Sequence, residues 1–203
     1  MADVSTLFFD IGGVLLTNGW DRHSRRAAID ELGLDWEEFQ DRHDFVADAF
    51  ETDAIDLDTY LERTVFYRSR PFTQDEMVDC MYRQSKRLGD TLDFVHELAR
   101  SGEYVLATLN NESRAINEHR IDEFGLRDIF SVFVSSCYVG AKKPDEEIYR
   151  LALDLTQKTA TECVFIDDRA LNLECATSTG MRTIHFESAE QLEADLAAVG
   201  VTR

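Results

Sequence analysis

Long hydrophobic runs, a surplus of basic residues and closely spaced cysteines are all missing from this sequence. No stretch approaches the roughly 18 apolar residues that a membrane-spanning helix needs, so we expect no membrane partner. The 21 lysine and arginine residues face 40 aspartates and glutamates, which gives a net charge of −19. A surface of that charge repels nucleic acid, which argues against a DNA- or RNA-binding role.

The four cysteines lie far apart, with no C-x-x-C pair and no histidine at zinc-ligand spacing. Disulfide frameworks and structural zinc sites both depend on closely spaced ligands, so we expect four reduced, buried thiols. The first residues carry no basic segment ahead of their apolar run, unlike a secretory signal. Together these features predict a cytoplasmic protein.

The sequence does contain a regular alternation of strand-like and helix-like segments. Five short apolar runs rich in β-branched and aromatic residues are typical of buried parallel strands. They cover residues 4–10, 103–108, 131–135, 162–168 and 182–186. Segments with helical periodicity follow the later runs or precede them, at 91–100, 112–124, 145–155, 171–180 and 189–199. The alternation predicts an α/β protein with a Rossmann-like, doubly wound parallel sheet.

One block interrupts that alternation. Between the first and second expected strands, four helical patterns follow one another without a convincing strand. They cover residues 21–32, 36–50, 57–67 and 73–88. We therefore predict an α-helical cap at 18–88, inserted into a core formed by 1–17 and 89–203.

Polar residues stand at or just beyond the ends of four of the expected strands. The carboxyl ends of parallel strands meet at one edge of a doubly wound sheet, where ligands bind. In chain order these residues are Asp10, Thr108, Asn110, Asn111, Lys143, Asp167, Asp168 and Asn172, with the apolar Leu109 between Thr108 and Asn110. We expect three carboxylates, one lysine and one hydroxyl to converge at one crevice.

This combination of side chains has a chemical meaning. Three neighbouring carboxylates repel one another unless a cation is present, and an oxygen-only site suits Mg²⁺. An aspartate can act as a covalent nucleophile in phosphoryl transfer, while a lysine and a hydroxyl stabilise the phosphoryl oxygens. Gly12 and Gly13, two and three residues after Asp10, let the backbone approach a phosphate closely. The residues thus predict Mg²⁺-dependent phosphoryl chemistry.

The same residues resemble the four motifs of the haloacid dehalogenase superfamily, whose members are mostly phosphatases. The resemblance covers nearly the whole chain, and the motifs stand in the family's order. They are similar to Phe8–Leu15, Leu106–Thr108, Lys143-Pro144 with Glu147-Ile148-Tyr149, and Phe165–Asp168 with Asn172. The helical insert after the first motif is similar to the family's helical-cap subclass.

The resemblance implies a role for each residue of the crevice. Asp10 would be nucleophile and metal ligand, and an aspartyl-phosphate would form on it. The metal site would comprise Asp10, Gly12 through its backbone carbonyl, Asp168 directly and Asp167, with Asn172, through the water shell. Thr108 would hold a phosphate oxygen and Lys143 would neutralise charge. The implied substrate is a small phosphate monoester, a sugar phosphate or a nucleotide, which would contact Gly13, Leu109, Asn110 and Asn111. The protein would be a monomer or a homodimer.

One departure from the family pattern leaves alternatives open. Most phosphatases of the family carry a second aspartate two residues after the nucleophile, as general acid, and here that position is Gly12. Phosphatases of the family with a glycine at this position do exist. The proton for the leaving group could then come from Thr17, His23 or a metal-bound water. A metal-free 2-haloacid dehalogenase and a non-catalytic phosphate-binding protein are the competing functions. The pair Asp167-Asp168 favours the phosphatase, because adjacent carboxylates beside the nucleophile need a cation.

Three individual assignments also have simpler explanations. Thr108 could be an ordinary strand residue, because threonine favours strands. Lys142 rather than Lys143 could be the functional lysine. Asn111 could cap the helix that follows it instead of contacting substrate.

Overall fold

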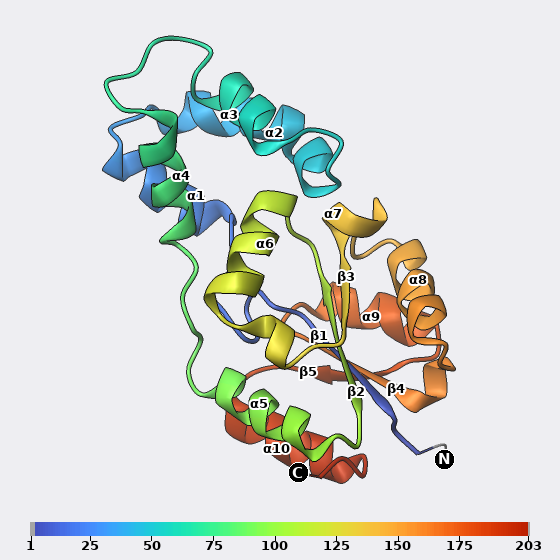
Figure 1. The fold of residues 1–203 in the computed structure, drawn as a ribbon. Helices are drawn as coiled ribbons and strands as arrows, with labels where there is room; N and C mark the ends of the chain where they lie inside the picture. The colour runs from blue at the N-terminus through green and yellow to red at the C-terminus, as the bar shows by residue number, and fades with distance from the viewer. Residues whose placement is uncertain (1–2, 203) are drawn as a thin grey trace.

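The computed structural model describes residues 3–202, and five parallel strands within that range form one sheet in the order β3-β2-β1-β4-β5 (Figure 1). The strands are β1 (Thr6–Phe9), β2 (Val105–Asn110), β3 (Val132–Ser135), β4 (Cys163–Asp167) and β5 (Arg182–His185). All four residues of β1 and all five of β4 are buried, as expected for strands covered on both faces. The predicted Rossmann-like parallel sheet is confirmed.

Helices cover both faces of this sheet. The core helices are α5 (Thr91–Ser101), α6 (Arg114–Glu123), α7 (Ser136–Val139), α8 (Glu146–Thr156), α9 (Ala170–Ser178) and α10 (Ala189–Ala198), with short 3₁₀ turns at Leu126–Asp128 and Ala160–Glu162. Apolar residues of α5, α6 and α10 pack on one face of the sheet. Those of α8 and α9 pack on the other. The sheet is therefore doubly wound.

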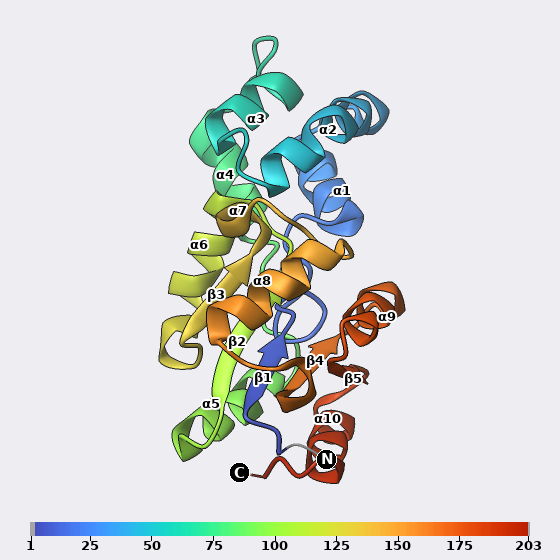
Figure 2. The ribbon, with the colours of Figure 1, turned by 90° about the vertical axis from the view of Figure 1, so that its right-hand side faces the viewer.

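Four further helices form the inserted cap. They are α1 (Arg22–Glu31), α2 (Trp36–Glu51), α3 (Leu57–Thr64) and α4 (Gln74–Tyr82). Each begins after a residue whose side chain accepts a backbone hydrogen bond from the first turn; these residues are Asp21, Asp35, Asp56 and Thr73. The four helices share a hydrophobic cluster of their own, which only Ile116 of α6 joins from the core within residues 3–202. Figure 2 shows them grouped at one end of the molecule, with α5 and α10 at the other.

Two adjoining segments connect the cap to the core. Leu16 and Arg87 form an antiparallel bridge, and the Thr17 amide donates to the Lys86 carbonyl at 2.8 Å. The Thr17 hydroxyl donates to the Gln84 carbonyl at 2.8 Å and accepts from the Lys86 amide at 3.0 Å. We propose these segments as the boundary of the cap predicted at 18–88.

The element ends expected from the sequence differ from the structure by at most two residues, except at the ends of two helices. The helix expected at 73–88 stops at Tyr82, because the following backbone pairs with Thr17 instead of continuing the helix. The helix expected at 57–67 stops at Thr64. The second strand runs on to Asn110 instead of ending at Thr108, because its last residues pair with β3.

Two other expectations concern the whole chain. No helix in the described chain combines the length and hydrophobicity needed to traverse a bilayer. All four cysteines are free thiols, and three of them are buried. Cys175 is partly exposed, so the expectation of four buried thiols was wrong for this residue.

Candidate active site

Asp10 stands directly after β1, at the carboxyl end of the central strand of the sheet. Its amide donates to the Ile166 carbonyl at 2.9 Å, which keeps the chain in register with β4 for one more residue. Its Oδ1 accepts a hydrogen bond from the Ile11 amide at 2.8 Å. Its Oδ2 lies 3.0 Å from Lys143 Nζ. Burial raises the pKa of the Asp10 carboxyl to about 6, with Lys143 opposing that rise.

Lys143 is the cation of this cluster. Its Nζ lies 2.6 Å from Asp167 Oδ2 as well as 3.0 Å from Asp10, and its side chain is only 2% exposed. Asn111 fixes the backbone of Lys143 in two places, since its side-chain amide donates to the Lys143 carbonyl and accepts from the Lys143 amide, both at 2.8 Å. Asn111 does not cap α6, which begins after Ser113. Asn111 lines the cavity and contacts the Lys143 backbone, and its predicted contact with substrate stays a prediction.

The neighbouring Lys142 points to the cap instead. Its ammonium group pairs with Asp48 and Glu51 of α2. Of the two adjacent lysines, Lys143 is therefore the one that contacts Asp10. A second ion pair between core and cap joins Arg114 of α6 to Asp53, just beyond α2, with 2.7 Å between Arg114 Nη2 and Asp53 Oδ2.

Asp167 is the last residue of β4 and Asp168 follows it, and the two carboxylates have different surroundings. Asp167 is fully buried, and its two oxygens accept from Lys143, the Arg169 amide and the Asn172 side chain. Asp168 Oδ1 is buried without a hydrogen-bond partner among the residues that the structure describes. An unpartnered buried carboxylate oxygen is costly, so this atom is available to a ligand.

The carboxylates fit a divalent cation. Asp10, Asp167 and Asp168 each offer an oxygen, and these three atoms all lie within 4.8 Å of one another. Gly13 has φ +79°, and a Cβ there would collide with the Asp168 carboxylate. A glycine at this place lets the loop pass close to the acidic pair. A cluster of hard oxygen ligands of this size suits Mg²⁺.

Mg²⁺ is expected to raise the midpoint of thermal unfolding, because a ligand that binds only the folded state stabilises it by mass action. At a hundredfold excess over Kd the gain is about 2.7 kcal/mol, which is about 5–10 °C for a chain of this length. Asp168→Asn should remove most of that shift, measured by scanning calorimetry with and without MgCl₂. Asp122→Asn, which changes an exposed carboxylate on α6, should keep it. Equal shifts in both variants would place the cation elsewhere.

A cavity of about 460 Å³ lies between these residues and the cap. Core residues that line it include Asp10, Gly12, Asn111, Lys143 and Asn172. Cap residues that line it include Trp20, Arg25, His43, Phe50 and Glu51. Asp10, Lys143 and Asn172, predicted from strands one, three and four, thus line one cavity together with cap residues. Gly13, Asp167 and Asp168 are not among the lining residues, although Asp167 and Asp168 lie in the carboxylate cluster with Asp10.

Three residues predicted from the second strand do not line that cavity in the described chain. Thr108 pairs in register with Phe9, is fully buried, and its hydroxyl has no hydrogen-bond partner among residues 3–202. Leu109 belongs to the hydrophobic core. The Asn110 amide group is bonded to Asn117 at 3.0 Å and to Ser135 at 2.8 Å. The geometry supports the simpler explanation of Thr108 as a strand residue, and it leaves Leu109 and Asn110 only their backbone for a substrate contact.

The two candidate proton donors named from the sequence also lie outside the cavity lining. The Thr17 hydroxyl is engaged by Gln84 and Lys86 at the cap boundary. His23 is exposed on α1. Neither residue is among those that enclose Asp10 in the described structure.

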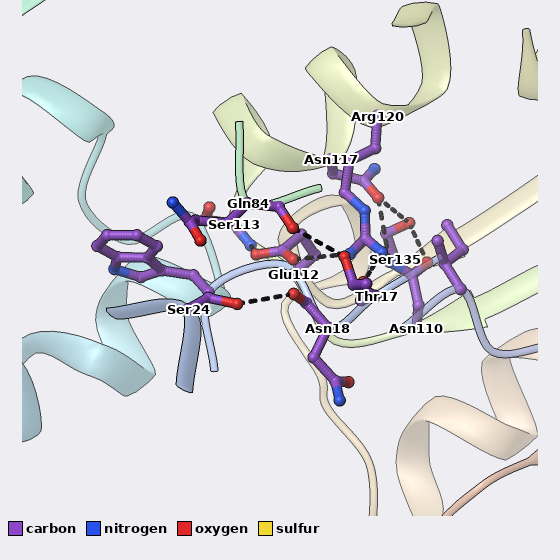
Figure 3. A network of polar contacts seen from close by, with 12 residues as sticks. Thr17, Asn18, Ser24, Gln84, Asn110, Glu112, Ser113, Asn117, Arg120 and Ser135 are labelled. Atoms are coloured by element: carbon purple, nitrogen blue, oxygen red, sulfur yellow. Dashed lines mark hydrogen bonds and ion pairs between the residues drawn. The ribbon is translucent and has the colours of Figure 1, made fainter. Parts of the chain in front are cut away.

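A buried ion pair in the cavity wall escaped the sequence analysis. Arg120 Nη1 lies 3.1 Å from Glu112 Oε2, and the two side chains are only 2% and 7% exposed. Figure 3 shows Arg120 reaching from α6 to Glu112 and to Thr17, whose carbonyl accepts from Arg120 Nη2 at 2.7 Å. Burial raises the pKa of Glu112 to about 7, with Arg120 opposing the rise. In the sequence both residues look like ordinary surface charges of a helix, so no signal pointed to them.

Comparison with known proteins gives consistent matches. A sequence model of the haloacid dehalogenase-like hydrolases matches residues 4–178. Flavin mononucleotide hydrolase 1 of Arabidopsis thaliana is 32% identical over 79% of this chain, which spans 64% of that protein's length. A phosphatase of Mycobacterium tuberculosis is 29% identical over 97% of this chain and 95% of its own.

Solved structures share the fold. A HAD family enzyme of Bacteroides thetaiotaomicron in complex with magnesium and inorganic phosphate has a TM-score of 0.77, with 20% identity, over 93% of this chain and 98% of that one. An L-2-haloacid dehalogenase has a TM-score of 0.63, with 17% identity, over 89% of this chain and 82% of its own. The fold is thus shared by a structure with magnesium and phosphate bound and by a dehalogenase.

Proposed function

Since this chain belongs to the haloacid dehalogenase-like hydrolases, we propose that it is a Mg²⁺-dependent phosphatase that hydrolyses a small phosphate monoester through an aspartyl-phosphate. The observation that carries the proposal is the environment of Asp10. A buried carboxylate and a buried lysine 3.0 Å from it line one cavity, and an unpartnered Asp168 oxygen belongs to the same carboxylate cluster as Asp10. A nucleophile, a charge stabiliser and a cation ligand are the groups that phosphoryl transfer to a carboxylate requires.

The first step assigned to these residues is attack on phosphorus. The Ile11 amide holds Asp10 Oδ1, which leaves Oδ2 to attack the phosphoryl group. A bond forms between Oδ2 and phosphorus while the bond from phosphorus to the leaving oxygen breaks. Lys143 Nζ lies beside Oδ2 and stabilises the negative charge of the transferred group. Water then attacks phosphorus, releases inorganic phosphate and regenerates the carboxylate.

Asp10, Asp168 and the Gly12 carbonyl would hold Mg²⁺, which when bound neutralises the carboxylates and the incoming phosphate. Asp167 is committed to Lys143, Asn172 and the Arg169 amide, so we assign it to orienting the lysine and to the outer shell of the cation. Asn111 has a similar supporting role, because it holds the Lys143 backbone on both sides.

The size and chemistry of the cavity support a small substrate. A volume of about 460 Å³ suits a compact molecule, and the cap closes over it. The net charge of −19 speaks against a polyanionic macromolecule as substrate. We therefore propose a sugar phosphate or a nucleotide. Because Gly12 supplies no acid, esters with good leaving groups should react fastest.

Release of inorganic phosphate from p-nitrophenyl phosphate, sugar phosphates and nucleotides tests the function. The expected result is turnover that requires MgCl₂ and stops with EDTA, with the highest kcat on p-nitrophenyl phosphate. A dehalogenase remains the competing function, since the fold is shared with one. Chloride release from 2-chloropropionate without metal, together with no phosphate release, would overturn the phosphatase in favour of that activity. No turnover of either kind would point to a binding protein.

A further inference from the structure

The cap side of the cavity holds a chain of three hydrogen-bonded side chains that the proposed chemistry does not use. Trp20 Nε1 lies 2.8 Å from the Tyr60 hydroxyl, and His43 Nδ1 lies 2.9 Å from the same hydroxyl. Trp20 and His43 line the cavity, whereas Tyr60 is fully buried behind them. The three residues come from the start of the cap, from α2 and from α3, so only the folded cap brings them together.

The direction of each hydrogen bond follows from the chemistry of the donors. An indole N–H can only donate, so the Tyr60 hydroxyl accepts from Trp20. Burial raises the pKa of Tyr60 above its ordinary value, which keeps the phenol protonated. Its single hydrogen therefore points to its other partner, His43 Nδ1. An imidazole that accepts at Nδ1 is neutral and carries its hydrogen on Nε2.

Other contacts hold the imidazole in this state and in one orientation. Burial, with Arg25 adding to it, lowers the pKa of His43 to about 4, while Asp44 opposes the shift. Phe39 stacks on one side of the ring with a centroid distance of 6.1 Å, and Tyr60 meets it edge-on at 5.9 Å. His43 is 6% exposed and lines the cavity, and its Nε2 has no hydrogen-bond partner in the described chain. One oriented N–H is thus available to a molecule in the cavity.

We propose that His43 is a specificity-determining residue, whose Nε2–H donates a hydrogen bond to an uncharged oxygen acceptor on the leaving group of the phosphate ester. Trp20 and Tyr60 are positioning residues, because they act only by fixing the tautomer of His43. The proposal rests on the phosphatase function and narrows its substrate class to esters whose leaving group bears a hydroxyl or carbonyl. His43 does not replace the general acid that is missing at Gly12, because a neutral imidazole does not protonate a leaving group.

The tautomer can be measured without any substrate. Nitrogen-15 NMR of the wild-type protein should show His43 as the Nε2–H tautomer from pH 6 to 8. In Tyr60→Phe, which removes the hydrogen donated to Nδ1, the two tautomers should become mixed. A wild-type His43 protonated at Nδ1, or an unchanged tautomer in Tyr60→Phe, would overturn the chain of hydrogen bonds.

Steady-state kinetics test the contact with substrate. His43→Phe should raise KM for sugar phosphates and nucleotides by roughly tenfold, the effect of one lost hydrogen bond. It should leave KM unchanged for phenyl phosphate, whose leaving group carries no further acceptor. His43→Gln places an amide N–H near the position of Nε2 and should recover most of the loss, which a purely structural role of His43 would not produce.

Two kinetic outcomes would overturn the proposal. An equal rise of KM for phenyl phosphate would mean that His43 only shapes the cap. No rescue by His43→Gln would mean that no donor is needed. If the wild type releases phosphate from no ester, the phosphatase function itself fails, and the NMR result still decides separately whether Trp20 and Tyr60 set the tautomer.

Discussion

Asp10→Asn is expected to lower kcat by about 10³-fold or more for every ester, to the background of the assay. An amide oxygen is a far weaker nucleophile than a carboxylate and cannot form the acyl-phosphate. The fold should survive, because an asparagine Oδ1 still accepts from the Ile11 amide and Lys143 keeps Asp167 at 2.6 Å. Phosphate release and the thermal midpoint, measured on the same preparation, separate lost chemistry from lost structure.

Asp122→Asn is the matched control for this substitution. It removes the same charge from a carboxylate that is 72% exposed on α6 and pairs only with Arg127 among the described interactions. Its kcat should stay within about twofold of wild type, since exposed ion pairs contribute little. A rate in Asp10→Asn close to that of Asp122→Asn would show that another group attacks phosphorus.

Arg120→Met is expected to lower the free energy of unfolding by about 3–5 kcal/mol. The substitution leaves Glu112 buried without its cation and removes the hydrogen bond to the Thr17 carbonyl. Without Arg120, the buried Glu112 carboxyl either keeps an unpaired charge that the surrounding protein solvates poorly or takes up a proton, and both cost free energy. For a chain of this length the thermal midpoint should fall by about 10 °C. Urea denaturation and calorimetry both measure the change.

Arg127→Met provides a close comparison. The Arg127–Asp122 pair has a distance of 3.3 Å, close to the 3.1 Å of the Arg120–Glu112 pair, but its side chains are 62% and 72% exposed. Its loss should lower stability by less than about 1 kcal/mol. The double variant Arg120→Met/Glu112→Met should recover most of the loss of Arg120→Met, since no charge is then left unpaired. Equal effects of Arg120→Met and Arg127→Met would contradict the role given to burial.

Local sequence patterns were sufficient for the sheet and for most helices. Buried strands such as Cys163–Asp167 read as uninterrupted apolar runs, and cap helices begin after residues such as Asp35 that cap them directly. The errors lie where contacts with a distant segment of the chain determine the end of a helix or strand. The residues after Tyr82 could have continued a helix, but Thr17 takes up their backbone groups. The pattern of one segment cannot report a partner that is far away in the chain.

The same limit applies to the candidate site. Asp10, Lys143 and Asp168 follow parallel strands, so their convergence is a consequence of the sheet and could be predicted. Thr108 was expected at the end of its strand because that end was set two residues too early. His43 and Arg120 lie on helices whose relation to Asp10 depends on how the cap packs against α6. No periodicity in the sequence contains that information.

For the core, the cap is a loop whose two ends already touch. Leu16 and Arg87 are bridge partners, and Thr17 is bonded to the backbone on the returning side. The entropy of closing a loop grows with the logarithm of its length, about 0.6 kcal/mol for each doubling. Lengthening or shortening the insert therefore changes the stability of the sheet little while this junction is intact. The lining of the cavity can diverge with the cap while the carboxylate cluster beneath it stays the same.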